Sequence, residues 1–162
     1  MAIVARRYLC LDPASRVVGW ASLDSRAGEI LNAGKVSETK GTYVERCDKL
    51  AVKIRRLAQT EGTDGVVIEV PSGKVHMSHG GRGEGLSIYG FAVATIRAAL
   101  KELWDVAEIP VAEWKSGYSK EKAIKVATKH YPRYRSLKDS GADIADAIAL
   151  GVWFYAFRLR GR

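Results

Sequence analysis

The stretch that most restricts the fold of this chain is residues 8–24, with the sequence YLCLDPASRVVGWASLD. It opens with a short apolar run that ends at one carboxylate, Asp12, and Pro13 follows directly. Because proline cannot donate a ladder hydrogen bond, this pattern predicts a buried strand that stops there. Residues 14–16 predict a tight turn, and residues 17–23 predict a second strand. The acid at the strand end indicates either a turn-initiating aspartate or a cation site, and this stretch alone leaves both open.

The remaining pattern predicts an α/β fold in a single domain that covers residues 1–162. A third strand is expected at residues 30–36, which gives an antiparallel meander. Residues 66–70 form a near-continuous apolar run, as in a strand buried on both faces, and Pro110 places a strand over 106–112 at an edge. Helices are expected over residues 43–59, 86–104, 120–130 and 141–157.

Two of these helices have features that the structure can test. The helix over 43–59 begins with a capping box, because Thr42 precedes it and Glu45 follows three residues later. Its polar face is expected to be solvated and carries Arg46, Lys49, Lys53, Arg55 and Arg56. The helix over 86–104 has an apolar stripe at Tyr89, Val93, Ile96, Leu100 and Leu103.

Charge and cysteine content restrict the partners and the compartment. The net charge of +8 and the pI near 9.6 favour a polyanionic partner, nucleic acid first and an anionic membrane surface second. Cys10 and Cys47 both lie in apolar patterns, so we expect them to be buried and reduced, as in the cytosol. The first ten residues contain no signal-peptide core, and the longest apolar run, 147–157, is too short to span a bilayer.

Acidic residues recur where the predicted elements end or begin. Glu69 interrupts the apolar fourth strand, and a glutamate in such a strand should be paired or bound to metal. Asp143 and Asp146 are three residues apart on the last helix and share one face, although they also suit its dipole. If these residues converge with Asp12, divalent metal would offset their mutual repulsion.

A long glycine-rich segment, residues 71–85, follows Glu69. Such a loop beside a candidate acid is more often functional than not, and we expect Lys74, His76, His79 and Arg82 to contact nucleic acid. The spacing of the two histidines is weak support for a metal pair. No Walker A pattern is present in the segment.

Three stretches together resemble the RuvC-type Holliday-junction resolvases of the RNase H-like superfamily. Residues 9–20, LCLDPASRVVGW, resemble the opening strand and turn of that family. Residues 66–69, VVIE, resemble its strand with the second acid, and residues 142–147, ADIADA, resemble its closing motif. The three occur in order over nearly the whole chain.

The resemblance implies an RNase H-like fold, with a mixed central sheet of about five strands flanked by helices. It implies that two Mg²⁺ or Mn²⁺ ions per active site are held by Asp12, Glu69, Asp143 and Asp146. The family also uses lysines near the scissile phosphate, and Lys115 and Lys122 fall in the matching region.

Two departures from the family pattern are visible. Ala14 replaces a glycine, and the loop after Glu69 is longer and lacks the aromatic wedge that the family often has there. These departures and the short chain favour a phage member of the family.

The function that the resemblance implies is a homodimeric, metal-dependent endonuclease that resolves four-way DNA junctions by paired symmetric nicks, in the cytoplasm of a bacterial or phage-infected cell. We expect its dimer interface on the helix over 86–104, at Gly90, Ala92 and Ala94. The expected DNA-binding residues are Lys74, His79, Arg82, Lys115, Lys120 and Lys122. The alternatives are another RNase H-like nuclease acting on RNA–DNA hybrid or branched DNA, and a non-catalytic junction-binding protein.

Overall fold

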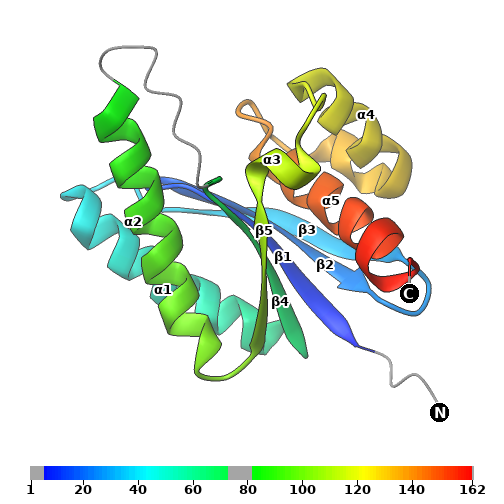
Figure 1. Cartoon of the computed structure of the whole chain (residues 1–162), viewed down its shortest axis with the longest axis horizontal. Coiled ribbons are helices and arrows are strands. Elements are labelled where there is room, and N and C mark those ends of the chain that lie inside the picture. The colour runs from blue at the N-terminus through cyan, green and yellow to red at the C-terminus, as the bar shows by residue number, and fades with distance from the viewer. Residues whose placement is uncertain (1–5, 73–81, 162) are drawn as a thin grey trace.

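A computed structural model describes residues 6–72 and 82–161 and contains one five-stranded mixed sheet (Figure 1). The spatial order of the strands is β3-β2-β1-β4-β5. The first three strands form an antiparallel meander, while β4 runs parallel to β1 and β5 runs parallel to β4. The strands are β1 (Arg7–Pro13), β2 (Val17–Asp24), β3 (Glu29–Ser37), β4 (Gly65–Val70) and β5 (Asp105–Pro110).

Helices cover both faces of the sheet, so the molecule has three layers and two apolar cores. Two long helices cover one face, and the remaining helices cover the other face or its upper edge (Figure 1). The helices on the first face are α1 (Tyr43–Thr60) and α2 (Arg82–Lys101). Those on the second are α3 (Val111–Trp114), α4 (Lys120–His130), the short η1 (Pro132–Ser136), α5 (Asp143–Phe154) and η2 (Tyr155–Leu159).

Side-chain alternation along the central strands decides which residues meet each helical layer. In β1, Leu9 and Leu11 belong to the core under α1 and α2, whereas Cys10 belongs to the core under α5. In β4, Val67 belongs to the α5 core. The next residues in the same alternation are Asp12 and Glu69, so both acids continue the α5 side of the sheet at the strand ends.

Most predicted elements are confirmed, and the differences lie at their ends. The capping box is present, because Glu45 N–H donates to Thr42 and Thr42 N–H donates to Glu45. The strand predicted over 106–112 stops at Pro110, because Val111–Trp114 turns into the helix α3. The helix predicted over 86–104 begins at Arg82 and ends at Lys101, which leaves Leu103 half exposed instead of on the buried stripe.

The prediction that Arg46 is solvated is wrong. Its side chain is 8% exposed, and Nε donates to the Ser15 carbonyl at 3.0 Å while Nη1 donates to the Gly41 carbonyl at 2.7 Å. The guanidinium is buried because it satisfies carbonyls of two loops that no strand partner reaches. It thereby ties the β1–β2 turn to the start of α1.

The two cysteines are buried and free, as predicted. No helix in the described part of the chain has the length and apolarity needed to cross a bilayer.

Candidate functional site

The site begins with two acids at the carboxyl ends of neighbouring parallel strands. The β1–β4 register pairs Leu11 with Ile68, so the following residues, Asp12 and Glu69, are level with each other. Both lie on the α5 side of the sheet by the alternation described above. Glu69 is buried, and Asp12 is partly buried.

The third contribution comes from α5, which rests on the sheet at a glycine. Gly19 of β2 is directly opposite Asp12 in the antiparallel register. A Cβ atom at Gly19 would lie 1.9 Å from the Asp143 carbonyl oxygen, which is an impossible contact. Only glycine therefore lets the first turn of α5 approach β2 this closely, and this approach brings Asp143 and Asp146 beside Asp12.

The start of α5 is held from outside the helix by Asp139. Its carboxylate accepts hydrogen bonds from the backbone N–H groups of Ile144 (3.1 Å) and Ala145 (3.0 Å), and from the hydroxyl of Tyr134 (2.9 Å). It thus does the work of a capping side chain, because Ala142, at the N-cap position, has a left-handed backbone (φ 62°) and no polar side chain.

Lys115 places one positive charge among these acids. Its Nζ donates to Asp146 Oδ2 at 2.7 Å and lies 3.7 Å from Glu69 Oε2. Burial disfavours the charged amine, but Glu69, the hydrogen bond to Asp146 and the charge of Asp12 outweigh it and raise the pKa of Lys115. The lysine is therefore held as an ammonium ion inside the carboxylate cluster.

Repulsion among the acids is visible in Asp12. Burial raises its pKa well above the ordinary value, and the charges of Glu69, Asp146 and Asp143 raise it further, while Lys115 opposes them. No donor among the described residues hydrogen-bonds this carboxylate. Asp12 is thus the acid of the cluster that most lacks a compensating partner.

Glu69, by contrast, has a donor on each oxygen. The Tyr89 hydroxyl donates to Oε1 at 3.1 Å, and the Trp114 indole N–H donates to Oε2 at 2.9 Å. Glu69 was predicted to be paired or bound to metal, and the structure shows it paired with two hydrogen-bond donors. Burial first, and then the nearby Glu69 charge, raise the pKa of Tyr89, which keeps its hydroxyl protonated and donating.

The donor chemistry of the cluster suits a hard divalent cation, because carboxylate oxygens are the ligands that Mg²⁺ and Mn²⁺ prefer. In the described residues, no group of three or more acids, histidines or cysteines is arranged to ligate a single ion as it stands. The Lys115 ammonium is already bound to two of the acids. The residues fit a divalent cation in kind and charge. Lys115 occupies Oδ2 of Asp146, the oxygen for which a cation would compete with it.

The predicted DNA-binding residues fall into two groups. Lys120 and Lys122 are exposed at the start of α4, and the Lys122 ammonium lies 4.4 Å from the Tyr118 ring centroid. Lys74, His76 and His79 lie outside the described residues, and Arg82 is the first residue of α2.

Positive charge is concentrated on one segment, residues 114–138, which runs from the acid cluster through α4 and η1. It holds eight lysines and arginines and one acid, Glu121, so it accounts for +7 of the net charge of +8. All eight except Lys115 are exposed. They are Lys115, Lys120, Lys122, Lys125, Lys129, Arg133, Arg135 and Lys138.

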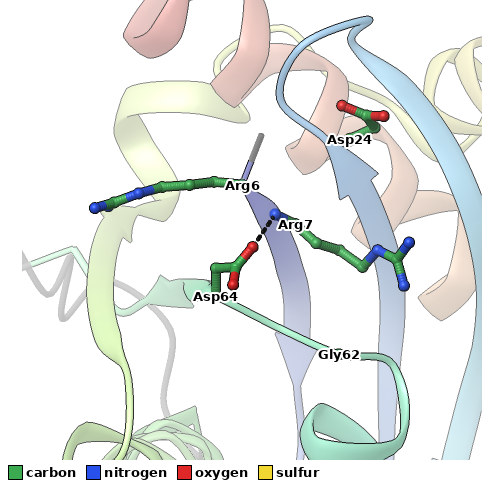
Figure 2. Close-up of a pocket in the computed structure, with 5 residues that line it drawn as sticks. All are labelled: Arg6, Arg7, Asp24, Gly62 and Asp64. Atoms are coloured by element: carbon green, nitrogen blue, oxygen red, sulfur yellow. Dashed lines mark hydrogen bonds between the residues drawn. The ribbon is translucent and has the colours of Figure 1, made fainter. Parts of the chain in front are cut away.

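A separate cavity of about 280 Å³ lies at the opposite end of β1 and β4 (Figure 2). In it, the Arg7 backbone N–H donates to Asp64 at 2.8 Å, and the side chains of Arg6 and Arg7 point apart. Gly62 and Asp24 complete its lining. With two arginines and two aspartates, this cavity has no net charge and takes no part in the acid cluster.

Three residues that shape the site were not predicted as site residues: Tyr89, Trp114 and Asp139. Tyr89 lies on the apolar stripe predicted for the helix over 86–104, and no role is predicted for Trp114. The Tyr89 hydroxyl and the Trp114 indole N–H gain a role only by donating to Glu69. Glu69 lies 20 residues before Tyr89 and 45 residues before Trp114. The one sequence signal was Glu69 itself, since a buried acid requires donors from somewhere.

Comparison with solved structures identifies the fold. RuvC of Thermus thermophilus in complex with a Holliday-junction substrate aligns with a TM-score of 0.69 and 17% identity, over 96% of each chain. A second Thermus thermophilus RuvC structure aligns with a TM-score of 0.67 and 14% identity, again over 96% of each chain. The yeast mitochondrial Holliday-junction resolvase Ydc2 aligns with a TM-score of 0.61 and 12% identity, over 96% of this chain and 81% of that one.

No protein-family model and no curated protein sequence matches the chain. At such low identities, the structural likeness demonstrates the architecture alone. The chain has the RNase H-like fold that the sequence predicts, with a mixed five-stranded sheet flanked by helices.

Proposed function

We propose that this protein is a metal-dependent, structure-selective DNA endonuclease that resolves four-way junctions by paired symmetric nicks. The observation that carries the proposal is the convergence of Asp12, Glu69, Asp143 and Asp146 at one end of the sheet. Three separate elements supply these acids, and the pKa of Asp12 is raised first by burial and then by the charges of the other three acids. A purely structural role does not require so much like charge at one point.

In this proposal the four acids hold two Mg²⁺ or Mn²⁺ ions. The chemistry that such ions supply is activation of water and neutralisation of charge on a phosphodiester. The residues of the chain provide the rest: the carboxylates fix the position of the site on the sheet, and Lys115 would supply a positive charge to pair with the scissile phosphate.

The basic segment supports DNA as the substrate. Seven exposed basic side chains follow Lys115 within residues 114–138, so a polyanion held by them would run directly into the acid cluster. Lys120 and Lys122 are nearest in sequence to Lys115 and are assigned to phosphate contacts. Lys74, His79 and Arg82 are assigned to contacts near the exchange point.

Four-way junctions as the preferred substrate are supported by the fold, because structures with this architecture include two Holliday-junction resolvases from different organisms. Paired nicks on two equivalent strands require two acid clusters, and hence a two-fold dimer. We place its interface on the outer face of α2, where Phe91 is 37% exposed and Ala94 is also exposed. Ala92 is buried in the core and is removed from the predicted interface.

The decisive experiment compares Asp12→Asn with the wild type on one immobile four-way junction. Asn keeps the size of Asp and loses its charge, so junction binding in a gel shift should persist or strengthen, since it depends on the basic surface. Mg²⁺-dependent nicking should fall by at least ~10²–10³-fold, as when one transition-state interaction is lost. Nicking at the wild-type rate by a folded Asp12→Asn protein would overturn the proposal.

Substrate controls separate the alternatives. Labelled junction, linear duplex, flapped DNA and RNA–DNA hybrid are each incubated with Mg²⁺ and with EDTA. Faster cleavage of hybrid or flapped DNA identifies another RNase H-like nuclease, and junction binding without any cleavage identifies a non-catalytic binding protein. Light scattering at micromolar concentration tests the dimer, and a monomer that still cuts both strands would contradict it.

A further inference from the structure

The surroundings of Glu69 set it apart from the other acids of the cluster. Its side chain is almost fully buried, and its two oxygens receive hydrogen bonds from two neutral donors on different helices. Tyr89 reaches Oε1 from α2, in the layer on one face of the sheet. Trp114 reaches Oε2 from α3, at the upper end of β5 beside the other layer (Figure 1).

The two donors fix the carboxylate without neutralising it. An ionised carboxylate has about four lone-pair directions, and one neutral donor on each oxygen leaves further directions open. Because the donors approach from two separate layers, the carboxylate plane cannot rotate without breaking one of the hydrogen bonds. Trp114 is itself 2% exposed, so its indole is held by packing and cannot follow a moving partner.

We propose that Tyr89 and Trp114 are positioning residues that hold Glu69 as a preorganised ligand for a divalent cation. The inference rests on the proposed function, because it takes Glu69 to be a metal ligand. The physical reason is that outer donors orient a ligating carboxylate before the ion arrives, so the ion does not have to order it. Among the described residues, Lys115 is the one charged contact of Glu69: its Nζ lies 3.7 Å from Oε2, and an arriving cation would replace it there.

The test measures Mn²⁺ affinity in the absence of DNA, from the spin-resonance signal of free Mn²⁺ during a titration. Tyr89→Phe and Trp114→Phe each remove one donor and keep an aromatic ring. Each should weaken Mn²⁺ binding by roughly 10–100-fold, the usual effect of losing an outer-shell partner of a metal ligand.

Trp104→Phe is the matched control. The Trp104 indole N–H donates to the Thr63 carbonyl at 2.8 Å, a hydrogen bond to a neutral acceptor just beyond the end of α2. The control loses an indole hydrogen bond and the same ring volume away from the acid cluster, so it reports the general effect of exchanging tryptophan for phenylalanine. Its Mn²⁺ affinity should remain that of the wild type.

A second readout distinguishes positioning from mere stability. In a Glu69→Gln background the carboxylate is absent, so adding Tyr89→Phe should cause no further loss of Mn²⁺ affinity. An equal loss in both backgrounds would show that Tyr89 acts by another route. If Trp114→Phe does not fold, Tyr89→Phe decides the question alone, because Tyr89 is only partly buried.

The two levels of the proposal fail in different ways. If the wild type and Glu69→Gln bind Mn²⁺ equally, or if neither binds, the metal assignment of the proposed function is wrong. If Glu69→Gln binds Mn²⁺ more weakly than the wild type, while Tyr89→Phe and Trp114→Phe bind like the wild type, only the positioning role is overturned.

Discussion

The Nζ atom of Lys115 bridges Asp146 and Glu69, at 2.7 Å from the first carboxylate and 3.7 Å from the second. One ammonium ion therefore joins acids from α5 and from β4, two elements that belong to different parts of the chain. It supplies positive charge at the point where a divalent cation would otherwise be needed. If the proposed function holds, lysine and metal compete for the same carboxylates.

Replacing Lys115 with methionine should tighten Mn²⁺ binding by roughly tenfold, because a unit charge a few ångströms from the ion is removed in a partly screened setting. Nicking should nevertheless fall, since the phosphate loses its positive partner. A titration of free Mn²⁺ and a nicking assay on the same samples measure both effects. Lys49→Met, exposed on α1 across the sheet, is the control with the same charge change. Weaker Mn²⁺ binding by Lys115→Met would show that the lysine assembles the site and does not compete for it.

In EDTA, Asp12→Asn should raise the melting temperature at pH 7.5. Burial and the neighbouring acids raise the folded-state pKa of Asp12. Protonation of Asp12 therefore stabilises the folded protein, fully so below the unfolded-state pKa, and this stabilisation is lost as the pH rises through the folded-state pKa. Asn mimics the protonated form at every pH, and about 1 kcal/mol shifts the melting temperature of a domain this size by roughly 2–4 °C.

The advantage of Asp12→Asn should shrink as the pH is lowered towards the ordinary aspartate range, because the wild type then carries the proton itself. Thermal melts in EDTA between pH 4 and pH 8 measure this trend. The range begins at about the usual Asp pKa, near 3.9, and extends well above it. A variant that melts below the wild type at every pH would assign Asp12 a structural role in the turn.

Lys120→Gln combined with Lys122→Gln should weaken junction binding and lower its salt dependence. Each phosphate contact contributes about 0.9 to the slope of log affinity against log salt concentration, so the slope should fall by roughly 1–2. Gel shifts at several salt concentrations provide the measurement. Lys49→Gln combined with Arg56→Gln, both exposed on α1, removes the same charge from the opposite face of the sheet. Equal slopes for the two double variants would show that α4 is not the DNA surface.

Asp139→Ala should destabilise the protein by about 1–2 kcal/mol, the upper part of the range for a lost helix cap. It leaves two backbone N–H groups of α5 and the Tyr134 hydroxyl without their acceptor. Ser119→Ala, which removes the single cap of α4, should cost less. Urea unfolding measures the loss of stability in both variants. If Asp139→Ala costs less than Ser119→Ala, α5 is held by its packing alone.

The strand ends and the acids could be predicted because they are local features. Pro13 and Pro71 mark where β1 and β4 stop, and each acid lies just before that point. The alternation of side chains then places Asp12 and Glu69 on one face without further information. The fold followed from the same signals, because an antiparallel meander with a parallel fourth strand admits few arrangements.

The contacts that complete the site could not be predicted, because they depend on how the layers approach one another. Arg46 has the spacing of a solvated residue, and only the position of the β1–β2 turn makes it a buried donor. Trp114 lies on a four-residue helix, Val111–Trp114, whose first two residues were expected to continue the strand over 106–112. Asp139 caps a helix from four residues before its first residue, outside the range of the usual capping signals.

The bare backbone at Gly19 also has a consequence for the order of folding. α5 can be seated only when β2 is already paired with β1, since its first turn rests on the strand opposite Asp12. Bringing α5 onto β2 closes a long stretch of chain, which is entropically costly, and contacts between distant segments tend to form late. A partly folded chain could therefore hold Asp12 and Glu69 in the finished sheet while Asp143 and Asp146 are still absent. If the proposed function holds, we expect metal-dependent nicking to appear only after the sheet has formed during refolding, because a chain without a seated α5 lacks two of the four acids.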